Sequence, residues 1–325
     1  MTRTAAPITV VAGAGGFIGG HLVAALLNDG ARVRAVDVKP VTEWYQPHRE
    51  SDQLVLDLKE KAHAERAVDG ADTVYNLACD MGGMGFIERN RARCMLSVLI
   101  NTHLLEASRA ADVDRYFYAS SACVYPANLQ DRPDVVALKE DDVHPAMPEE
   151  GYGWEKLFGE KLCRYYYDDH GMTTRVARLH NVYGPHGTFG GGREKAPAAI
   201  CRKVAEASLS GRHVIDVWGD GHQTRTFTYI DDAIVGIRTL TASAMTNPLN
   251  IGSSEVVSIN DLIDIVSVIA GIEVERRHDL SQPQGVRGRS SDNTLIRELF
   301  DWEPSTPLRT GLEATYAWIH DQLTQ

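Results

Sequence analysis

The stretch ITVVAGAGGFIG, residues 8–19, decides the fold of this chain. Ile8–Val11 is an apolar run that predicts a buried strand, and in Phe17–Asn28 the apolar residues recur at helical spacing. The glycines between them permit a tight turn, a close approach of the backbone to a diphosphate, and close packing of the helix on the strand. The start of the helix also offers free N–H groups and a positive dipole end to phosphates. A dinucleotide is therefore expected here, contacted by Gly13, Gly16, Phe17, Ile18 and Gly19.

A carboxylate follows the second predicted strand, Val33–Val36, and indicates which dinucleotide binds. Asp37 comes directly after that strand, at the usual distance beyond the glycine loop. A carboxylate at this place accepts hydrogen bonds from ribose hydroxyls and repels a 2′-phosphate, which favours NAD over NADP. Further cofactor contacts are expected from Asp57, Leu58 and Ala78.

Strands and helices alternate along the first half of the chain. Thr73–Ala78 and Tyr116–Ser120 have the pattern of buried strands, and Leu96–Arg109 between them has that of a helix. Alternation of this kind produces a parallel sheet with helices on both faces. We therefore predict an α/β chain with a Rossmann-type doubly wound parallel sheet in residues 1–180. A smaller mixed α/β lobe is expected in residues 181–325, and some of its segments could return to the first domain.

After Asn181 the alternation of predicted strands and helices becomes less regular. Gly184–Gly192 is rich in glycine and must be a loop. Beyond it we expect helices at Glu194–Ala207, Asn260–Ala270 and Gly311–Leu323, and short strands at Val214–Val217 and Thr226–Tyr229.

Composition narrows the class of function. The 325 residues include 33 basic and 44 acidic side chains, for a net charge of −11, so nucleic acid is not an expected partner. The 5 cysteines form no CxxC pair and the 12 histidines no HExxH motif, which predicts neither a disulfide framework nor a metal site. Met1–Pro7 lacks an apolar signal core, and no segment reaches the length of a membrane span. A reduced, cytoplasmic protein is expected.

Tyr152 and Lys156 stand four residues apart in the predicted helix Tyr152–His170, so both side chains lie on one face. An ammonium beside a phenol favours the phenolate and lowers a pKa that is normally about 10. A tyrosine with a lowered pKa can take the proton of an alcohol while hydride leaves to a nicotinamide. Ser120 and Ser121 end a preceding strand, where a hydroxyl could hold the substrate oxygen.

The order of these features resembles that of the extended short-chain dehydrogenase/reductase family. In that family the glycine loop, the serine and the tyrosine–lysine pair recur in this order, and Asn181–Pro185 matches the turn after the next strand. The resemblance implies a tightly bound NAD, regenerated in each turnover, and a nucleotide-diphosphate sugar between the NAD domain and the C-terminal lobe. It also implies a homodimer in which Leu96–Arg109 and Tyr152–Asp169 of both subunits form a four-helix bundle.

Further motifs resemble those members of the family that invert C3 and C5 of GDP-mannose. They are SSACVYP at residues 120–126, GGREKAP at 191–197, DMGGMGF at 80–86, WGDG at 218–221 through Arg225, and GVRGR at 285–289. The resemblance runs from about Val10 to Trp318 and implies an isomerase that acts on GDP-mannose. Recognition of guanine is implied by the resemblance alone.

Cys123 and Lys195, within two of these motifs, suit an inversion at two carbons. Oxidation of C4 of a hexose gives a ketone that acidifies the C–H bonds at C3 and C5, and inversion then needs a base on one face and an acid on the other. A nearby cation lowers the pKa of a thiol, and desolvation lowers that of a lysine. We expect Cys123 to remove the C5 proton and Lys195 to return one from the opposite side, with the same pair acting again at C3.

Other residues of these motifs are implied as substrate contacts. Arg287 and Arg289 alternate across a glycine, so in an extended segment both point to one face, where a guanidinium can bind two oxygens of a diphosphate. The glycines at 82–85 would let a hexose approach backbone N–H groups. The set expected at the substrate is Met81, Gly82, Gly83, Ser121, Ala122, Cys123, Asn181, Glu194, Lys195, Lys203, Gln223, Arg225, Arg287 and Arg289.

Ser97 departs from the family's pattern. Related enzymes have an asparagine nine residues before the helix glutamate, here Glu106, and that asparagine is thought to support a proton-relay water near the lysine. Ser97 could replace it in part, so the relay is expected to differ here while the overall chemistry does not.

Alternatives to this function stay open at the level of the sequence. A related epimerase that inverts only C3 or C5 of a heptose or deoxysugar would use the same cysteine and lysine. A nucleotide-sugar 4-epimerase needs neither, because it only rotates the keto-sugar over the nicotinamide. A 4,6-dehydratase typically carries an Asp-Glu pair where this chain has Cys123. A non-catalytic NAD-sensing scaffold has no need of the tyrosine, cysteine and lysines.

Overall fold

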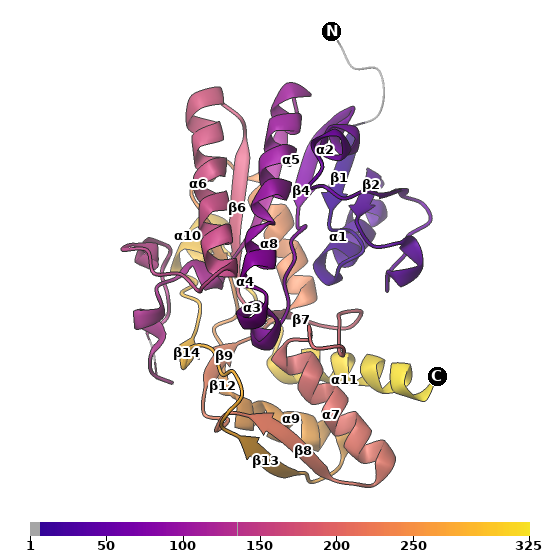
Figure 1. The fold of residues 1–325 in the computed structure, drawn as a ribbon, viewed down its shortest axis with the longest axis vertical. Coiled ribbons are helices and arrows are strands. Elements are labelled where there is room, and N and C mark those ends of the chain that lie inside the picture. The colour runs from indigo at the N-terminus through magenta and orange to yellow at the C-terminus, as the bar shows by residue number, and fades with distance from the viewer. Residues whose placement is uncertain (1–6, 135) are drawn as a thin grey trace.

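The computed structural model describes residues 7–134 and 136–325, so most of Met1–Pro7 lies outside it. At its centre is a parallel sheet of seven strands in the order β11-β6-β5-β4-β1-β2-β3 (Figure 1). The strands are β1 (Ile8–Ala12), β2 (Arg32–Asp37), β3 (Asp52–Val55), β4 (Ala71–Asn76), β5 (Arg115–Ser121), β6 (Thr174–Leu179) and β11 (Leu249–Ile251).

Helices cover both faces of this sheet, which confirms the predicted doubly wound α/β class. One face packs on α2 (Lys61–Val68), α5 (Val98–Ala110) and α6 (Tyr152–His170), and the other on α1 (Phe17–Asn28) and α8 (Ile230–Ala242). Because apolar layers lie on both sides, the central strands are largely buried, and in β6 all six residues are buried.

The second half of the chain returns to this sheet. β11 pairs in parallel with β6, and α8 packs against α1, so both belong to the central layers. The boundary at residue 180 stays a prediction.

A smaller lobe lies below the carboxyl ends of the central strands in Figure 1. Its core is formed by three helices and by short strands that pair as β8 with β13, β7 with β10, and β12-β9-β14. The elements are β7 (Val182–Tyr183), α7 (Ala196–Ser210), β8 (Val214–Trp218), β9 (Thr224–Thr226), β10 (Thr228–Tyr229), β12 (Val256–Ser258), α9 (Ile259–Ala270), β13 (Glu275–Asp279), β14 (Gly288–Arg289) and α11 (Leu308–Thr324). Short helices α3 (Met84–Arg89), α4 (Arg91–Met95) and α10 (Thr294–Phe300) complete the fold.

Several predicted elements begin or end one to three residues away from those observed, and two of the differences have a clear physical reason. α7 begins at Ala196, not at Glu194, because Pro197 fits the first turn of a helix and Lys195 caps it in an extended conformation. The predicted strand Thr226–Tyr229 is two strands, since β9 pairs with β12 while β10 pairs with β7. Among residues 7–134 and 136–325, no helix combines the length and apolar character needed to cross a membrane.

Candidate active site

The glycine loop between β1 and α1 is shaped to take a dinucleotide. Gly13 has a φ of +87°, and a Cβ there would lie 2.9 Å from the backbone nitrogen of Ala78, at the carboxyl end of the neighbouring strand β4. A Cβ at Gly19 would lie 2.1 Å from the carbonyl oxygen of Gly13. No side chain caps the start of α1, so its first N–H groups remain available to phosphate oxygens.

Asp37 ties the end of β2 to this loop. Its side chain is buried, and its two oxygens accept the backbone N–H groups of Gly15 and Lys39, each at 3.0 Å. Each carboxylate oxygen keeps a further lone pair for a ribose hydroxyl. Asp57 and Leu58 follow β3 next to this strand end, since Leu56 N–H donates to the carbonyl of Asp37. The glycine loop, Asp37 and Asp57–Leu58 thus lie at the carboxyl ends of three neighbouring parallel strands, β1, β2 and β3.

Replacement of Gly19 by alanine is expected to weaken NAD binding at least tenfold, about 1.4 kcal/mol. The new Cβ would overlap the backbone of Gly13, so the loop must move, and overpacking of this kind also costs about 1–3 kcal/mol of folding stability. Titration calorimetry with NAD and thermal unfolding measure the two effects. Gly20→Ala is the matched control, because the three atoms nearest its Cβ would all belong to the side chain of Gln46 and none to the backbone of the loop. Wild-type NAD affinity in Gly19→Ala would contradict the expectation.

Tyr152 and Lys156 lie buried in the first turns of α6, with Nζ of the lysine 5.5 Å from the tyrosine ring centre. Burial raises the pKa of Tyr152 well above its usual value, and the neighbouring Cys79, Cys123 and Glu155 raise it further. The predicted lowering of this pKa is therefore wrong for the structure as it stands. The ammonium does not offset the loss of solvent around the phenol.

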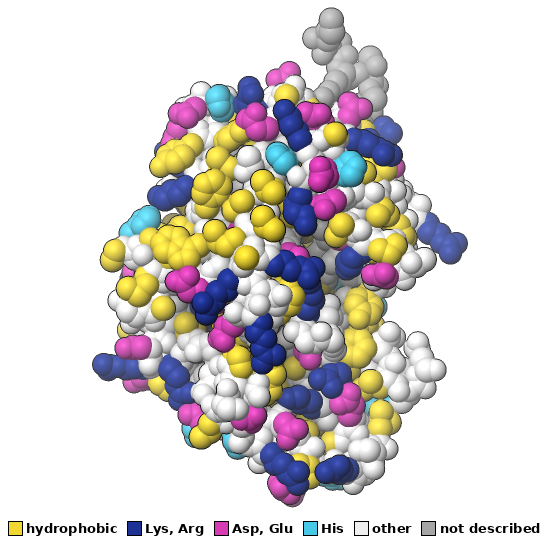
Figure 2. All heavy atoms as spheres, in the orientation of Figure 1, with side chains coloured by type: hydrophobic (Ala, Val, Ile, Leu, Met, Phe, Trp, Pro, Cys, Tyr) yellow, Lys and Arg dark blue, Asp and Glu magenta, His cyan; other side chains and the backbone are white. Residues whose placement is uncertain are grey.

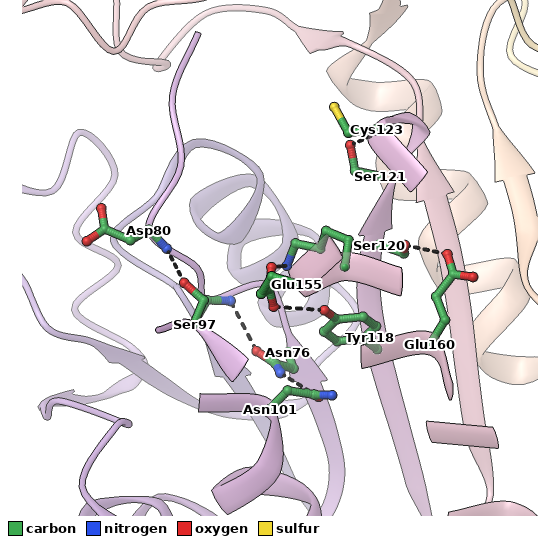
Figure 3. Close-up of polar contacts among 12 residues, drawn as sticks. Asn76, Asp80, Ser97, Asn101, Tyr118, Ser120, Ser121, Cys123, Glu155 and Glu160 are labelled. Atoms are coloured by element: carbon green, nitrogen blue, oxygen red, sulfur yellow. Dashed lines mark hydrogen bonds and ion pairs between the residues drawn. The ribbon is translucent and has the colours of Figure 1, made fainter. Parts of the chain in front are cut away.

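Three other groups also lie near the same ammonium. Desolvation lowers the pKa of Lys156, but Cys79 and Glu155 raise it by more, so the lysine keeps its proton. Oε2 of Glu155 lies 3.3 Å from Nζ, and Nζ also lies 4.9 Å from the ring centre of Tyr118 in β5. Figure 3 shows Glu155 in contact with Tyr118, below the end of β5 that carries Ser121 and Cys123.

Cys123 stands just beyond the end of β5, in a short 3₁₀ turn. Its backbone N–H donates to Oγ of Ser121 at 3.2 Å, and Nη1 of Arg289 donates to its sulfur at 3.3 Å. Burial raises the pKa of the thiol, Glu149 raises it further, and Arg289 lowers it by less. The expected cation is present, but the expected net lowering of the pKa is wrong, because burial and Glu149 together outweigh Arg289.

Lys195 is the residue that caps the start of α7, and its side chain interacts with Cys123 and Cys79. Burial lowers its pKa, as expected from the sequence, while Cys123 and Cys79 raise it by less. Its segment packs on the glycines after β4: Gly83 N–H donates to the carbonyl of Arg193 at 3.0 Å, and a Cβ at Gly83 would lie 2.4 Å from the carbonyl of Glu194. That N–H group is thus paired within the chain and not free for a hexose.

Four further predicted substrate residues lie in or next to the paired strands β9 and β14. Gln223 is buried with no partner for Oε1 among the described residues, and Arg225 donates to the carbonyls of Thr224 and Val286. Burial lowers the pKa of Arg225 to about 9. The Arg289 side chain faces Cys123, whereas that of Arg287 forms a paired salt bridge with Asp220, so the two guanidinium groups point to different partners.

Three further predicted substrate residues contact the backbone or neighbouring side chains. Nδ2 of Asn181 donates to the carbonyl of Thr226 at 3.1 Å, and Nζ of Lys203 to that of Asp216 at 2.5 Å. Glu194 accepts the backbone N–H of Gly192 at 2.7 Å. Met81 packs with Cys123 and Tyr152, and Ala122 is buried beside Cys123.

Sequence reasoning missed three residues that the fold brings to the site. Cys79 packs with Cys123 and Tyr152, and Glu149 lies 3.8 Å from Arg289. Glu155 contacts Lys156 as described above. Cys79 could have been found from its place at the carboxyl end of a central strand, where ligands bind in open α/β sheets. Glu149 lies in an irregular segment that no periodicity places.

The fold and this site define a class of protein. Residues 9–252 match the NAD dependent epimerase/dehydratase family, and the chain belongs to that family. NAD is its cofactor, and the glycine loop, Asp37 and the free start of α1 are the features of this structure that fit it.

Individual relatives and solved structures show which members of this family the chain is similar to. GDP-mannose 3,5-epimerase 1 of Oryza sativa subsp. japonica is 45% identical over 314 residues, which cover 96% of this chain and 82% of that protein. UDP-glucose 4-epimerase of Thermotoga maritima, solved with UDP-glucose, has a TM-score of 0.86 at 24% identity over 97% of this chain and 99% of that one. UDP-glucuronic acid 4-epimerase from Bacillus cereus, solved with UDP-glucuronic acid and NAD, has a TM-score of 0.81 at 28% identity over 97% and 99%.

Proposed function

We propose that this chain is a GDP-mannose 3,5-epimerase. The observation that carries the proposal is the convergence of Cys123 and Lys195 beside Tyr152 and Lys156, in a chain similar to a GDP-mannose 3,5-epimerase over nearly its whole length. A tyrosine–lysine pair alone serves oxidation and reduction. A thiol and an amine beside it provide the acid and base that inversion at a carbon requires.

The residues divide the work between oxidation and inversion. Bound NAD supplies the acceptor for a hydride from C4 and returns it at the end of the cycle. Tyr152 takes the proton of the C4 hydroxyl, which Ser121 orients. Cys123 then removes the proton from C5, Lys195 delivers one to the opposite face, and the pair acts again at C3.

Burial shapes how the cysteine and lysine share a proton. A raised pKa for Cys123 and a lowered pKa for Lys195 both favour the uncharged thiol and amine. Transfer of one proton from the thiol to the amine gives a thiolate and an ammonium, which are the base and acid of the proposed cycle. The guanidinium of Arg289, at 3.3 Å from the sulfur, stabilises the thiolate when it forms.

Arg225 and Gln223 provide places for the diphosphate and the nucleotide. Arg225 is half-buried and forms no ion pair among the described residues, so an anion beside it would offset the cost of its desolvation. Gln223 keeps an unpaired oxygen, an acceptor for an N–H group of a base. Lys203 and Asn181 are proposed to contact the same nucleotide diphosphate, and Arg289 is proposed to lie beside the hexose.

Incubation of the purified protein with a panel of nucleotide sugars in deuterated water tests this function. We expect deuterium at both C3 and C5 of GDP-mannose. Label at a single carbon, or only in another nucleotide sugar, would favour a related epimerase of a heptose or deoxysugar instead. All five cysteines are free thiols, which fits the further proposal of a cytoplasmic enzyme.

A hydrophobic surface over α5 and α6 supports the proposed homodimer. Figure 2 shows apolar side chains gathered over these two helices, which pack side by side. A second copy of the same surface would complete a four-helix bundle. The exposed apolar side chains of α5 and α6 in this surface are Leu99, Trp154, Phe158 and Tyr165, and Met95 and Leu96 at the end of α4 precede them in the chain.

Replacement of Phe158 by glutamate is expected to convert the dimer into monomers. The side chain is 50% exposed on α6, and a carboxylate there would be buried without a partner in the bundle. Sedimentation velocity at one protein concentration measures the change. Val268→Glu on α9, which is as exposed and alters the charge equally, should remain dimeric. A monomeric wild type would contradict the dimer.

A further inference from the structure

Gln130 is a buried amide at the end of a short 3₁₀ helix that follows the segment of Cys123. The residue is only 1% exposed. Nε2 donates to the carbonyls of Tyr125 and Pro126 at 3.1 Å each, which uses both of its hydrogens. The amide oxygen Oε1 must therefore face the other way, where it accepts the Nε–H of Arg289 at 2.5 Å.

This contact holds the guanidinium of Arg289 in one orientation. A guanidinium is planar and rigid, so a fixed partner for Nε–H also sets the direction of the two terminal nitrogens. Nη1 donates to the sulfur of Cys123 at 3.3 Å, and Nη2 lies 3.8 Å from Oε2 of Glu149. Arg289 is buried, so the orientation depends on these protein groups.

Glu149 competes with Cys123 for the same guanidinium. A carboxylate is a much stronger acceptor than a thiol, and it favours a paired contact with an arginine. Among the described residues, Oε1 of Glu149 is buried without a hydrogen-bond partner, so a rotation of Arg289 towards it would satisfy that oxygen. The same rotation would take Nη1 away from the sulfur. Gln130 opposes the rotation because it holds Nε–H.

We propose that Gln130 is a positioning residue that directs the guanidinium of Arg289 onto the sulfur of Cys123 and away from Glu149. This inference rests on the proposed function, in which Cys123 removes a proton from the hexose. The thiol must become a thiolate for that step, and a hydrogen bond from a cation stabilises the thiolate. Gln130 acts through Arg289 and transfers no proton itself.

Several charged or titratable groups face Cys123 from other elements. They are Cys79 after β4, Glu149 before α6, Tyr152 of α6, Lys195 at the start of α7, Arg225 of β9 and Arg289 of β14. Within the described part of the chain, Arg289 is the cation among them that donates a hydrogen bond to the sulfur. Burial and Glu149 raise the pKa of the thiol and Arg289 lowers it, so loss of the Arg289 contact should raise that pKa further.

Replacement of Gln130 by methionine, a side chain of similar length without an amide, tests this role. The readout is deuterium incorporation at C3 and C5 at saturating GDP-mannose in deuterated water. At neutral pH we expect exchange to slow about tenfold, as for loss of a hydrogen bond to a charged group, and its pH profile to move to higher pH. Oxidation at C4, followed by nicotinamide absorbance in a single turnover, should match the wild type, because it depends on Tyr152 and Lys156.

A matched control and a second background show whether Gln130 acts through Arg289. Gln53→Met makes the same change in β3, where Nε2 donates to the carbonyl of His48 at 2.8 Å, and should behave as the wild type. In Arg289→Lys there is no Nε–H for Gln130 to accept, so Gln130→Met should change exchange by less than about twofold there. An equal loss in both backgrounds would mean that Gln130 only supports its loop, and would overturn the proposal.

A measurement on the wild type serves if Gln130→Met does not fold. In NMR spectra of the NAD-bound protein, the Nε–H of Arg289 is assigned by its absence from Arg289→Lys. It should exchange slowly with solvent, as expected of a buried, hydrogen-bonded group. Rapid exchange would contradict the contact between Gln130 and Arg289.

The proposed function and the role of Gln130 fail in different ways. If the wild type incorporates deuterium at C3 and C5, and Gln130→Met does so with the wild-type rate and pH profile, the role of Gln130 alone is wrong. If the wild type labels only another nucleotide sugar, the proposed substrate is wrong, and the same variants decide on Gln130 with that sugar. A wild type that labels no nucleotide sugar overturns both.

Discussion

Replacement of Cys123 by alanine is expected to lower deuterium incorporation at C3 and C5 of GDP-mannose by about 10²–10⁴-fold while oxidation at C4 continues. The variant lacks the proposed base, but Tyr152 and Lys156 remain in α6 with their contacts to Tyr118 and Glu155. Arg289 keeps Gln130, whose oxygen accepts its Nε–H at 2.5 Å, so the guanidinium stays in place. Deuterium at each carbon and nicotinamide absorbance, followed in one sample, separate the two steps.

The pH dependence of the same exchange follows from the environment of Cys123. Burial is the largest cause that raises the pKa of the Cys123 thiol, and the charge of Glu149 raises it further. Only the thiolate can remove a proton from carbon. The thiolate fraction therefore grows as pH rises, so exchange by Cys123 should accelerate from neutral towards alkaline pH, whereas inversion should slow there, because Lys195 then lacks the proton that it delivers. The slow exchange left in the alanine variant should lack this rise.

Cys201→Ala is the matched control for these measurements. Cys201 is a buried thiol in the core of the smaller lobe, packed by α7 and its neighbours, and the chemical change is identical. Its loss should leave exchange at C3 and C5 as in the wild type. Wild-type exchange in Cys123→Ala would show that another group is the base, and Cys79, which lies in the same cluster, would be the next candidate.

The fold was predictable because its signals are local. Residues 8–19 specify a strand, a turn and a helix by apolar pattern and glycine, and Asp37 closes the next strand, as observed. The start of α7 was predicted two residues too early, since periodicity continues through Glu194 and Lys195 while Pro197 sets the first turn. Phe227 interrupts the predicted strand Thr226–Tyr229, because the chain passes there from one small sheet to another.

The electrostatics of the site were less predictable, because they depend on contacts between distant segments. Lys156 and Tyr152 are neighbours along α6, but Cys79, which helps to hold the ammonium, comes from the end of β4. Arg289 reaches Cys123 from 166 residues away, and Glu149 reaches both from an irregular segment. Spacing within one helix shows which charges can meet, but the net pKa depends on burial, which only the assembled fold fixes.

Replacement of Tyr152 by phenylalanine is expected to slow both oxidation at C4 and exchange at C3 and C5. Each rate should fall by about 10²–10⁴-fold or more. Without the ketone at C4, the C–H bonds at C3 and C5 are not acidic enough for any thiolate to break. The variant loses one oxygen and keeps the ring that packs with Cys123 and Ile87, so the fold should persist. NAD affinity, measured by calorimetry, should stay close to that of the wild type.

A preformed 4-keto nucleotide sugar separates the role of Tyr152 from that of Cys123. Supplied to Tyr152→Phe, it should restore deuterium exchange at C3 and C5, because Cys123 and Lys195 are intact and the ketone is already present. Supplied to Cys123→Ala, the same compound should exchange slowly. If Tyr152→Phe failed to exchange even the keto-sugar, Tyr152 would be needed for inversion itself, and the division of the site into an oxidising pair and an inverting pair would be wrong.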